Sequence, residues 1–193
     1  AGFIGSPTMN MMEATVEEAG DDLFAAVGEQ RLKLAPEARD AHPRLREYVG
    51  RRVVLGVRPE DLEDAALVPD TPEDRRLTGR VMLTEELGSE INVHMEIGAP
   101  PVITEDTREL AEDLGTGHHF EAHERRRSDT SKIVGRFNPR TRARKGDLVE
   151  ASVDTRALHF FDLESGLGIY DGETDGRGSV GHEVPDKRRE VAA

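Results

Sequence analysis

The chain contains no cysteine and no tryptophan, and only 4% of its residues are aromatic. Without cysteine, disulfide bonds, thiolate zinc sites and cysteine nucleophiles are excluded. The few aromatic rings leave little surface on which nucleic-acid bases could stack. The formal net charge is −13, because 39 Asp and Glu residues outnumber 26 Lys and Arg residues. We therefore expect no nucleic-acid partner and no anionic membrane surface, because both require clustered Lys and Arg.

Long hydrophobic runs are also missing from the sequence. A membrane helix needs roughly 20 consecutive apolar residues, and no stretch approaches that length. Apolar residues make up 36% of the 193 residues and charged residues 34%. Such a composition predicts a modest core with long solvated loops. Because the first residue is Ala1, we expect the chain to be a piece of a longer protein.

The clearest structural signal is an alternation of apolar and polar residues within residues 79–97. A period of two is typical of a strand with one buried face. Gly88 lies between the two arms and can adopt the positive φ that a turn needs. We predict an antiparallel hairpin with a polar loop. The apolar side chains expected to face inward are Val81, Leu83, Ile91, Val93, Met95 and Ile97.

Several shorter segments show the same alternation. Strands are predicted at residues 12–16, 23–27, 31–34, 53–57, 132–137, 148–154 and 157–162, with a further short one at 65–68. A short helix broken at Pro43 is expected over residues 36–49, and a helical segment over 105–114. Turn residues separate the strands. The predicted fold class is mainly β, a small β-barrel or sandwich of about eight short strands with short helical insertions.

Sites for catalysis, cofactors or metals are poorly supported by the sequence. The only G-x-G-x-x-G, at residues 176–181, lacks the preceding strand and following helix that a dinucleotide site requires. His118, His119 and His123 could share a metal ion on a helix, as in a metal hydrolase. Because residues 125–127 are all Arg and would repel a cation, we interpret these histidines as exposed loop residues. We predict no catalytic residue, no cofactor and no metal site.

Four sequence blocks, taken in order, resemble a known family. They are FIGSPTMN at residues 3–10, LGVRPED at 55–61, ELGSEINVH at 86–94, and GDLVE at 146–150 followed by LHFFD at 158–162. Together they resemble the C-terminal regulatory half of the ATP-binding subunits of carbohydrate ABC importers, the family of the maltose importer's ATPase. The resemblance covers roughly residues 1–170. The insertion after Ile97 and the ending at residues 155–162 are similar to the multiple-sugar branch.

The resemblance implies a domain plan and an OB-like (TOBE) barrel. Residues 1–10 would join a missing upstream ATPase domain, 11–170 would form the regulatory domain with an insertion at 98–130, and 171–193 would be a disordered tail. Walker A, signature and Walker B motifs are absent from this sequence. The chain itself is therefore expected to be no enzyme, while ATP and Mg would bind only the upstream domain of a parent ATP hydrolase.

The resemblance also implies partners and a location. The expected partners are a second copy of the chain, the upstream ATPase domain, the importer's membrane subunits and a regulatory protein. The location would be cytoplasmic, at the inner face of the cell membrane. The candidate contact residues are Arg58, Pro59, Glu60, Asp61, Leu87, Gly88, Ser89, Glu90, His159, Phe160, Phe161 and Asp162.

Two features remain open at this point. The alternative function is a barrel that binds a small ligand, an oxyanion or a sugar, with Arg58, Arg80 and Ser89 as donors. The acidic composition disfavours an anion. A basic loop at residues 140–145 could meet an acidic partner surface, although such loops are more often only solvated.

Overall fold

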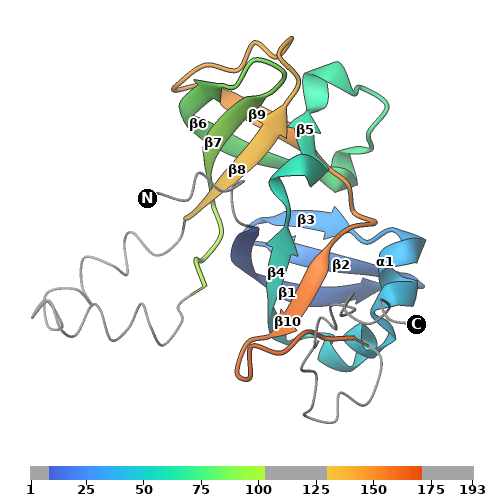
Figure 1. The fold of residues 1–193 in the computed structure, drawn as a ribbon. Coiled ribbons are helices and arrows are strands. Elements are labelled where there is room, and N and C mark those ends of the chain that lie inside the picture. Colours follow the sequence, from blue (N-terminus) through green and yellow to red (C-terminus); the bar gives the residue numbers. More distant parts are fainter. Residues whose placement is uncertain (1–8, 103–129, 171–193) are drawn as a thin grey trace, which may run out of the picture.

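The computed structural model describes residues 9–102 and 130–170 of the chain (Figure 1). Most of the expected junction at residues 1–10 lies outside these ranges. The predicted helical segment at 105–114, His118, His119 and His123, and the tail from residue 171 also lie outside them.

The first sheet combines the start of the chain with its last described strand. It contains β1 (Asn10–Ala19), β2 (Asp22–Val27), β3 (Gln30–Lys33), β4 (Arg52–Val57) and β10 (His159–Asp162), in the order β10-β4-β1-β2-β3. All these strands pair antiparallel. Alternate residues of β1 and β2 are buried, which is the pattern of a sheet with one face against a core.

The second sheet contains the middle of the chain and lies above the first in Figure 1. Its strands are β5 (Leu62–Asp64), β6 (Arg76–Glu86), β7 (Ile91–Ile97), β8 (Ser131–Phe137) and β9 (Leu148–Val153), in the order β5-β9-β6-β7-β8. The pairing is again antiparallel throughout. The mainly β prediction is confirmed, with ten strands in the described part instead of about eight.

The predicted broken helix is present as two short pieces. The α-helix α1 (Pro36–Ala41) is followed by the 3₁₀ helix η1 (Pro43–Tyr48), with a proline at the start of each. A proline fits the first turn of a helix but cannot continue the hydrogen bonding of a preceding one. Three further 3₁₀ turns are η2 (Pro59–Asp61), η3 (Ala65–Leu67) and η4 (Glu73–Arg75).

The strand predicted at residues 65–68 is wrong. The strand β5 ends at Asp64, and the following residues form η3. The carboxylate of Asp64 accepts a hydrogen bond of 2.9 Å from the backbone N–H of Ala66. Such a cap satisfies the first free N–H of a helical turn and so favours the turn over an extended strand.

The predicted hairpin is formed by β6 and β7, with one error. Val81, Met95 and most of the other predicted residues face the core, but the side chain of Leu83 is 49% exposed. The pairing of β6 with β7 shifts register between Val81 and Leu83. This bulge adds one residue and so turns the following side chains to the opposite face. Gly88 has the predicted positive φ, at +86°.

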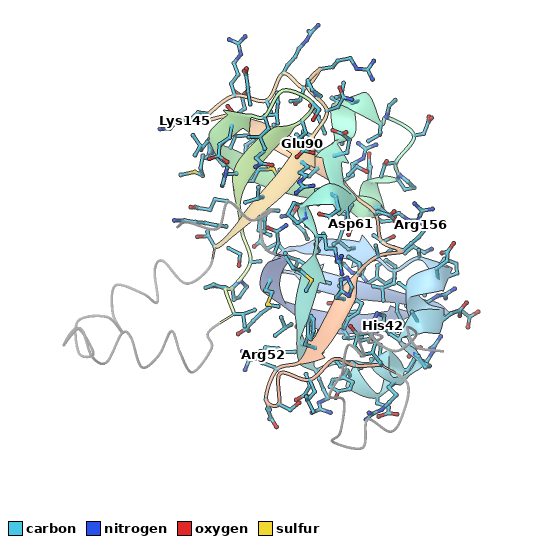
Figure 2. All side chains as sticks on the ribbon, viewed as in Figure 1. His42, Arg52, Asp61, Glu90, Lys145 and Arg156 are labelled. Atoms are coloured by element: carbon cyan, nitrogen blue, oxygen red, sulfur yellow. The ribbon has the colours of Figure 1, made fainter. Side chains whose placement is uncertain are left out.

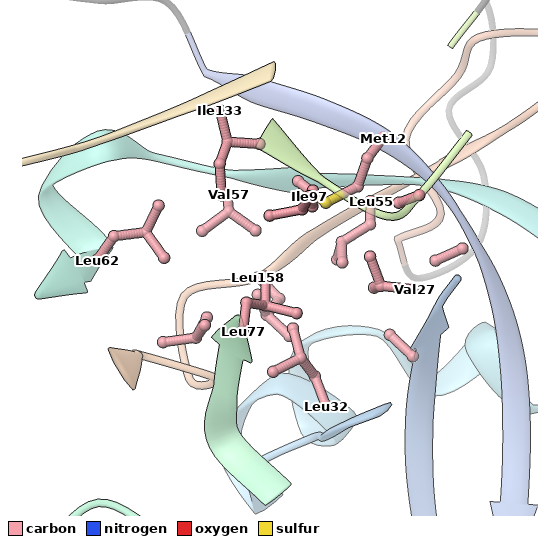
Figure 3. Close-up of a cluster of buried hydrophobic side chains, with 14 of the residues drawn as sticks. Met12, Val27, Leu32, Leu55, Val57, Leu62, Leu77, Ile97, Ile133 and Leu158 are labelled. Atoms are coloured by element: carbon pink, nitrogen blue, oxygen red, sulfur yellow. The ribbon is translucent and has the colours of Figure 1, made fainter. Parts of the chain in front are cut away.

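Apolar side chains from both sheets form one continuous core. Met12 and Leu55 of the first sheet and Leu77 and Ile133 of the second belong to the same buried cluster (Figure 3). The chain crosses from the first sheet to the second at residues 58–61, the outward crossing, and returns at residues 154–158, the return crossing. In the described residues, no helix has the length and apolar character needed to cross a membrane.

Candidate functional site

The structure brings two of the three predicted contact segments together. Strand β10 pairs with β4, so His159 lies opposite Gly56 and close to the outward crossing. The Nε of Arg58 donates to the Nε2 of His159 over 3.3 Å. Burial, followed by the charges of Arg58 and His42, lowers the pKa of His159. A neutral imidazole with Nε2 unprotonated is the form that can accept this hydrogen bond.

The two phenylalanines of β10 occupy different environments. Phe160 is fully buried in the core, and its ring meets the ring of His42 edge-on at 5.3 Å between centroids. Phe161 is half-buried, and its ring edge lies close to Gly56. Phe160 was predicted as a surface contact, but its side chain packs inside because alternate residues of β10 face the core.

The carboxylate of Asp162 accepts hydrogen bonds from the turn that follows β10. Its Oδ1 accepts hydrogen bonds of 2.8 Å from the backbone N–H of Ser165 and 2.8 Å from the Ser165 hydroxyl. These hydrogen bonds from Ser165 lower the pKa of Asp162, since they stabilise the carboxylate. The carboxylate therefore closes the turn that ends β10.

The side chains of the outward crossing differ in how far they are buried. Pro59 is buried, Glu60 is exposed and Asp61 is partly buried. Burial raises the pKa of Asp61, and the negative charges of Glu60 and Asp154 raise it further. Figure 2 shows Asp61 at the junction of the two sheets.

The third predicted segment, the hairpin loop at residues 87–90, does not lie beside residues 58–61 and 159–162. Figure 2 places Glu90 on the second sheet, well above Asp61. Gly88 and Ser89 of this loop are exposed. The loop closes through a hydrogen bond of 2.9 Å from Leu87 N to Glu90 O. Glu90 also faces Arg136 at 3.5 Å between Oε1 and Nε.

A surface that the sequence did not predict lies along β6. Its exposed apolar residues, the apolar strip, are Met82, Leu83, Leu87 and Leu148, with 41%, 49%, 55% and 65% of their surface exposed. Leu148 belongs to β9 and pairs with Arg80. The alternation of β6 predicted that Leu83 would be buried, so the strip was missed. The bulge turns the side chain of Leu83 to the exposed face, and a bulge leaves no simple sequence pattern.

The basic loop adjoins the apolar strip. The backbone N–H of Gly146, at the end of the loop, donates to Val81 O over 2.8 Å, and Val81 N donates back to Asp147 O over 2.9 Å. The exposed Arg142, Arg144 and Lys145 therefore sit beside the bulge in β6. Figure 2 shows Lys145 at the edge of the second sheet.

The donors of the small-ligand alternative do not converge. Arg58 contacts His159 near β10, the guanidinium of Arg80 donates to Gly146 O, and Ser89 is in the hairpin loop. Within residues 9–102 and 130–170, no group of three or more His, Asp or Glu side chains could hold a metal ion. The histidines of the metal alternative lie outside these ranges.

Comparison with known proteins gives matches over most of the chain. Residues 5–62 match the MalK OB fold domain and residues 55–123 match the TOBE domain. The trehalose/maltose import ATP-binding protein MalK of Thermococcus litoralis is 34% identical over 171 residues, covering 88% of this chain and 37% of that protein. The trehalose import ATP-binding protein SugC of Mycobacterium tuberculosis is 34% identical over 174 residues, covering 88% of this chain and 40% of the relative.

Two weaker similarities point to proteins of other names. The oligosaccharides import ATP-binding protein MsmX of Bacillus subtilis is 25% identical over 168 residues, or 87% of this chain and 36% of that protein. A solved structure of the cytoplasmic molybdate-binding protein ModG has a TM-score of 0.44 and 13% identity, covering 82% of this chain and 98% of its own. The ModG likeness is too weak to bear on function.

The chain spans well under half the length of these import proteins, at 36% to 40% of each. The part that matches carries the OB-fold and TOBE domains. These are the domains that the four sequence blocks predicted. The chain belongs to the family of C-terminal OB-fold and TOBE regulatory domains found in the ATP-binding subunits of sugar ABC importers.

Proposed function

We propose that the chain is the non-catalytic regulatory and dimerisation domain of a carbohydrate importer's ATP-binding subunit. The parent protein would couple ATP hydrolysis to sugar uptake, with ATP and Mg bound in the domain upstream of Ala1. The observation that carries the dimerisation role is the apolar strip beside the basic loop. The family of the chain supports the rest of the proposal.

The apolar strip has the character of a protein contact. Exposed apolar side chains grouped on neighbouring strands and rimmed by polar groups are typical of interaction sites. The neighbouring loop contributes Arg140, Arg142, Arg144 and Lys145 to a chain whose net charge is −13. We expect this basic loop to meet acidic residues of the second copy, because complementary charges favour correct docking. Importer membrane subunits and a regulatory protein are the other expected partners, at the inner face of the membrane.

Self-association tests the dimerisation role directly. Leu83→Glu places a charge in the apolar strip, and we expect it to weaken self-association at least tenfold in sedimentation over a concentration series. Leu167→Glu is the matched control, because Leu167 is 66% exposed in the turn after β10, away from the strip. A parent chain that stays monomeric over the whole series contradicts the dimerisation role, and so does equal weakening by both variants.

The importer assignment has its own test. The sequence encoded upstream of Ala1 is expected to carry Walker A, signature and Walker B motifs. An upstream region without a Walker A and a signature motif would refute the importer assignment while leaving the self-association result intact.

A further inference from the structure

His42 is a buried histidine whose two ring nitrogens both face backbone oxygens. It lies between α1 and η1, only 3% of its surface is exposed, and Figure 2 shows it beside the first sheet. Its Nδ1 lies 2.7 Å from Ile169 O and its Nε2 lies 3.1 Å from Leu158 O. Both distances are typical of hydrogen bonds. Because a carbonyl oxygen can only accept, each nitrogen must carry a hydrogen for both bonds to form.

Two ring hydrogens make the His42 side chain an imidazolium cation. A neutral imidazole has one N–H and one lone pair, so in either tautomer the lone pair would face one of the two carbonyl oxygens. A buried carbonyl left without its donor costs free energy. The ring of Tyr170 lies over the His42 ring, with 5.1 Å between centroids and 30° between planes. The face of an aromatic ring attracts a cation within about 6 Å, so this neighbour also favours the charged form.

The charged groups on the helical side of His42 leave room for its charge. Arg39, Asp40 and Arg46 share the wall of one cavity with His42. Arg39 donates to a backbone carbonyl of the turn between β1 and β2, and Arg46 pairs with Glu18. The carboxylate of Asp40 offers a compensating negative charge on the same wall.

On the side of β10, His159 is the titratable neighbour. Burial, followed by the charges of Arg58 and His42, lowers the pKa of His159. A neutral His159 is also the form that accepts the hydrogen bond from Arg58. We therefore expect the positive charge of this histidine pair to reside on His42.

We propose that His42 is a proton-dependent latch on β10. Leu158 precedes this strand and Ile169 follows it, so the doubly protonated ring holds both ends of the strand to the connector formed by α1 and η1. Loss of the second proton removes one of the two hydrogen bonds and loosens the strand. The latch thereby ties the position of β10, which carries the candidate contact residues His159 and Asp162, to the protonation of one buried side chain. It does not depend on the proposed dimerisation.

Nuclear magnetic resonance of the histidine rings in the whole chain measures the protonation directly. Long-range ¹H–¹⁵N spectra are recorded from about pH 5 to about pH 9, a series that spans the ordinary histidine range, and comparison with His42→Gln assigns the signals. We expect both nitrogens of His42 to be protonated in the acidic part of the series and one proton to be lost as the pH rises. A ring with only one protonated nitrogen throughout overturns the proposal, and a ring that stays doubly protonated throughout overturns its proton dependence.

Hydrogen exchange links that proton to the strand. Protection of the β10 amides that pair with β4, measured against the intrinsic exchange rate at each pH, should fall about tenfold as His42 loses its second proton, since one hydrogen bond is lost. In His42→Gln the protection should be low at every pH and show no step, because Gln does not titrate. In the same variant the pKa of His159 should rise, because one of the charges that lower it is removed.

His94→Gln is the matched control for the exchange experiment. His94 belongs to β7 of the second sheet, where it pairs with Glu85, so its removal should leave the step in the β10 amides unchanged. Three results refute the latch: a parent chain without the step, a step at a pH other than that at which the His42 ring loses its proton, and a step that persists in His42→Gln.

Discussion

Asn10 joins the two sheets through its side chain. It is the first residue of β1 in the first sheet, and its Nδ2 donates to Val134 O of β8 over 2.9 Å. The backbone N–H of Val134 donates back to Asn10 Oδ1 over 2.7 Å. The side-chain amide therefore pairs with β8 as a neighbouring strand would. Gln30 of β3 forms the same pair of hydrogen bonds with Thr78 of β6, at 3.1 Å and 2.6 Å.

The two amide pairs differ in burial, which sets the expected magnitudes. Asn10 is 6% exposed, whereas the Gln30 pair is open to solvent. Asn10→Ala removes two hydrogen bonds worth about 1 kcal/mol each and leaves the N–H and C=O of Val134 poorly solvated, for a total of about 2–4 kcal/mol. In Gln30→Ala, water replaces the lost partner, so the loss in the free energy of unfolding should be about 0.5–1 kcal/mol.

Urea unfolding followed by circular dichroism measures both values, provided that the two variants share the parent's m-value. Hydrogen exchange gives a second readout. The amide of Val134 should lose protection in Asn10→Ala and keep it in Gln30→Ala, because only the first variant removes its acceptor. If Asn10→Ala is no more destabilising than Gln30→Ala, burial does not control these pairs and the reasoning fails.

Two further predictions concern single positions. A Cβ at Gly28 would overlap the carbonyl oxygen of Gly98, whereas Gly20, with a similar positive φ of +63°, has open space around it. Gly28→Ala should therefore destabilise by more than about 3 kcal/mol and Gly20→Ala by only about 1 kcal/mol in urea unfolding; similar losses would contradict the overlap. Stability measured across a pH series should show opposite signs for two carboxyl groups. Asp61, whose pKa is raised by burial, favours the fold in acid and loses that contribution as pH rises through its folded value, so Asp61→Asn should exceed the parent's stability at neutral pH and match it in acid. Asp162, whose pKa is lowered by hydrogen bonds from its own turn, contributes above the ordinary carboxyl range and loses this as pH falls, so Asp162→Asn should be less stable at neutral pH and equal in acid. Shifts of the same sign in both variants would contradict the assignment.

The elements of the fold were largely readable from local patterns. The alternation in β1 and β7 follows from the period of a strand, which depends only on neighbouring residues. Pro43 breaks the helical region, and Gly88 turns the hairpin, for reasons that lie within one residue. The four blocks that indicated the family are also local, and the matches to the OB-fold and TOBE domains confirm that assignment.

Errors arose where a contact outside the local pattern decided the outcome. Leu83 is exposed because a bulge shifts its pairing with β7, and the bulge involves two strands. Phe160 is buried because β10 returns from the far end of the chain to pair with β4. The residues after Asp64 form a 3₁₀ turn because the Asp64 carboxylate accepts a hydrogen bond from the backbone N–H of Ala66. Residue propensities alone do not decide between such a turn and the strand that was predicted.

The sequence alone determined the strands, their turns and the family of this protein, because each depends on residues close together in the chain. Only the tertiary structure decided how the strands divide between two sheets and which side chains meet across them. Asp61 and Thr155 lie far apart in the sequence, and each is unremarkable there. They line one cavity because the chain crosses between the sheets at both positions, and strand order is set by non-local pairing that no short pattern encodes.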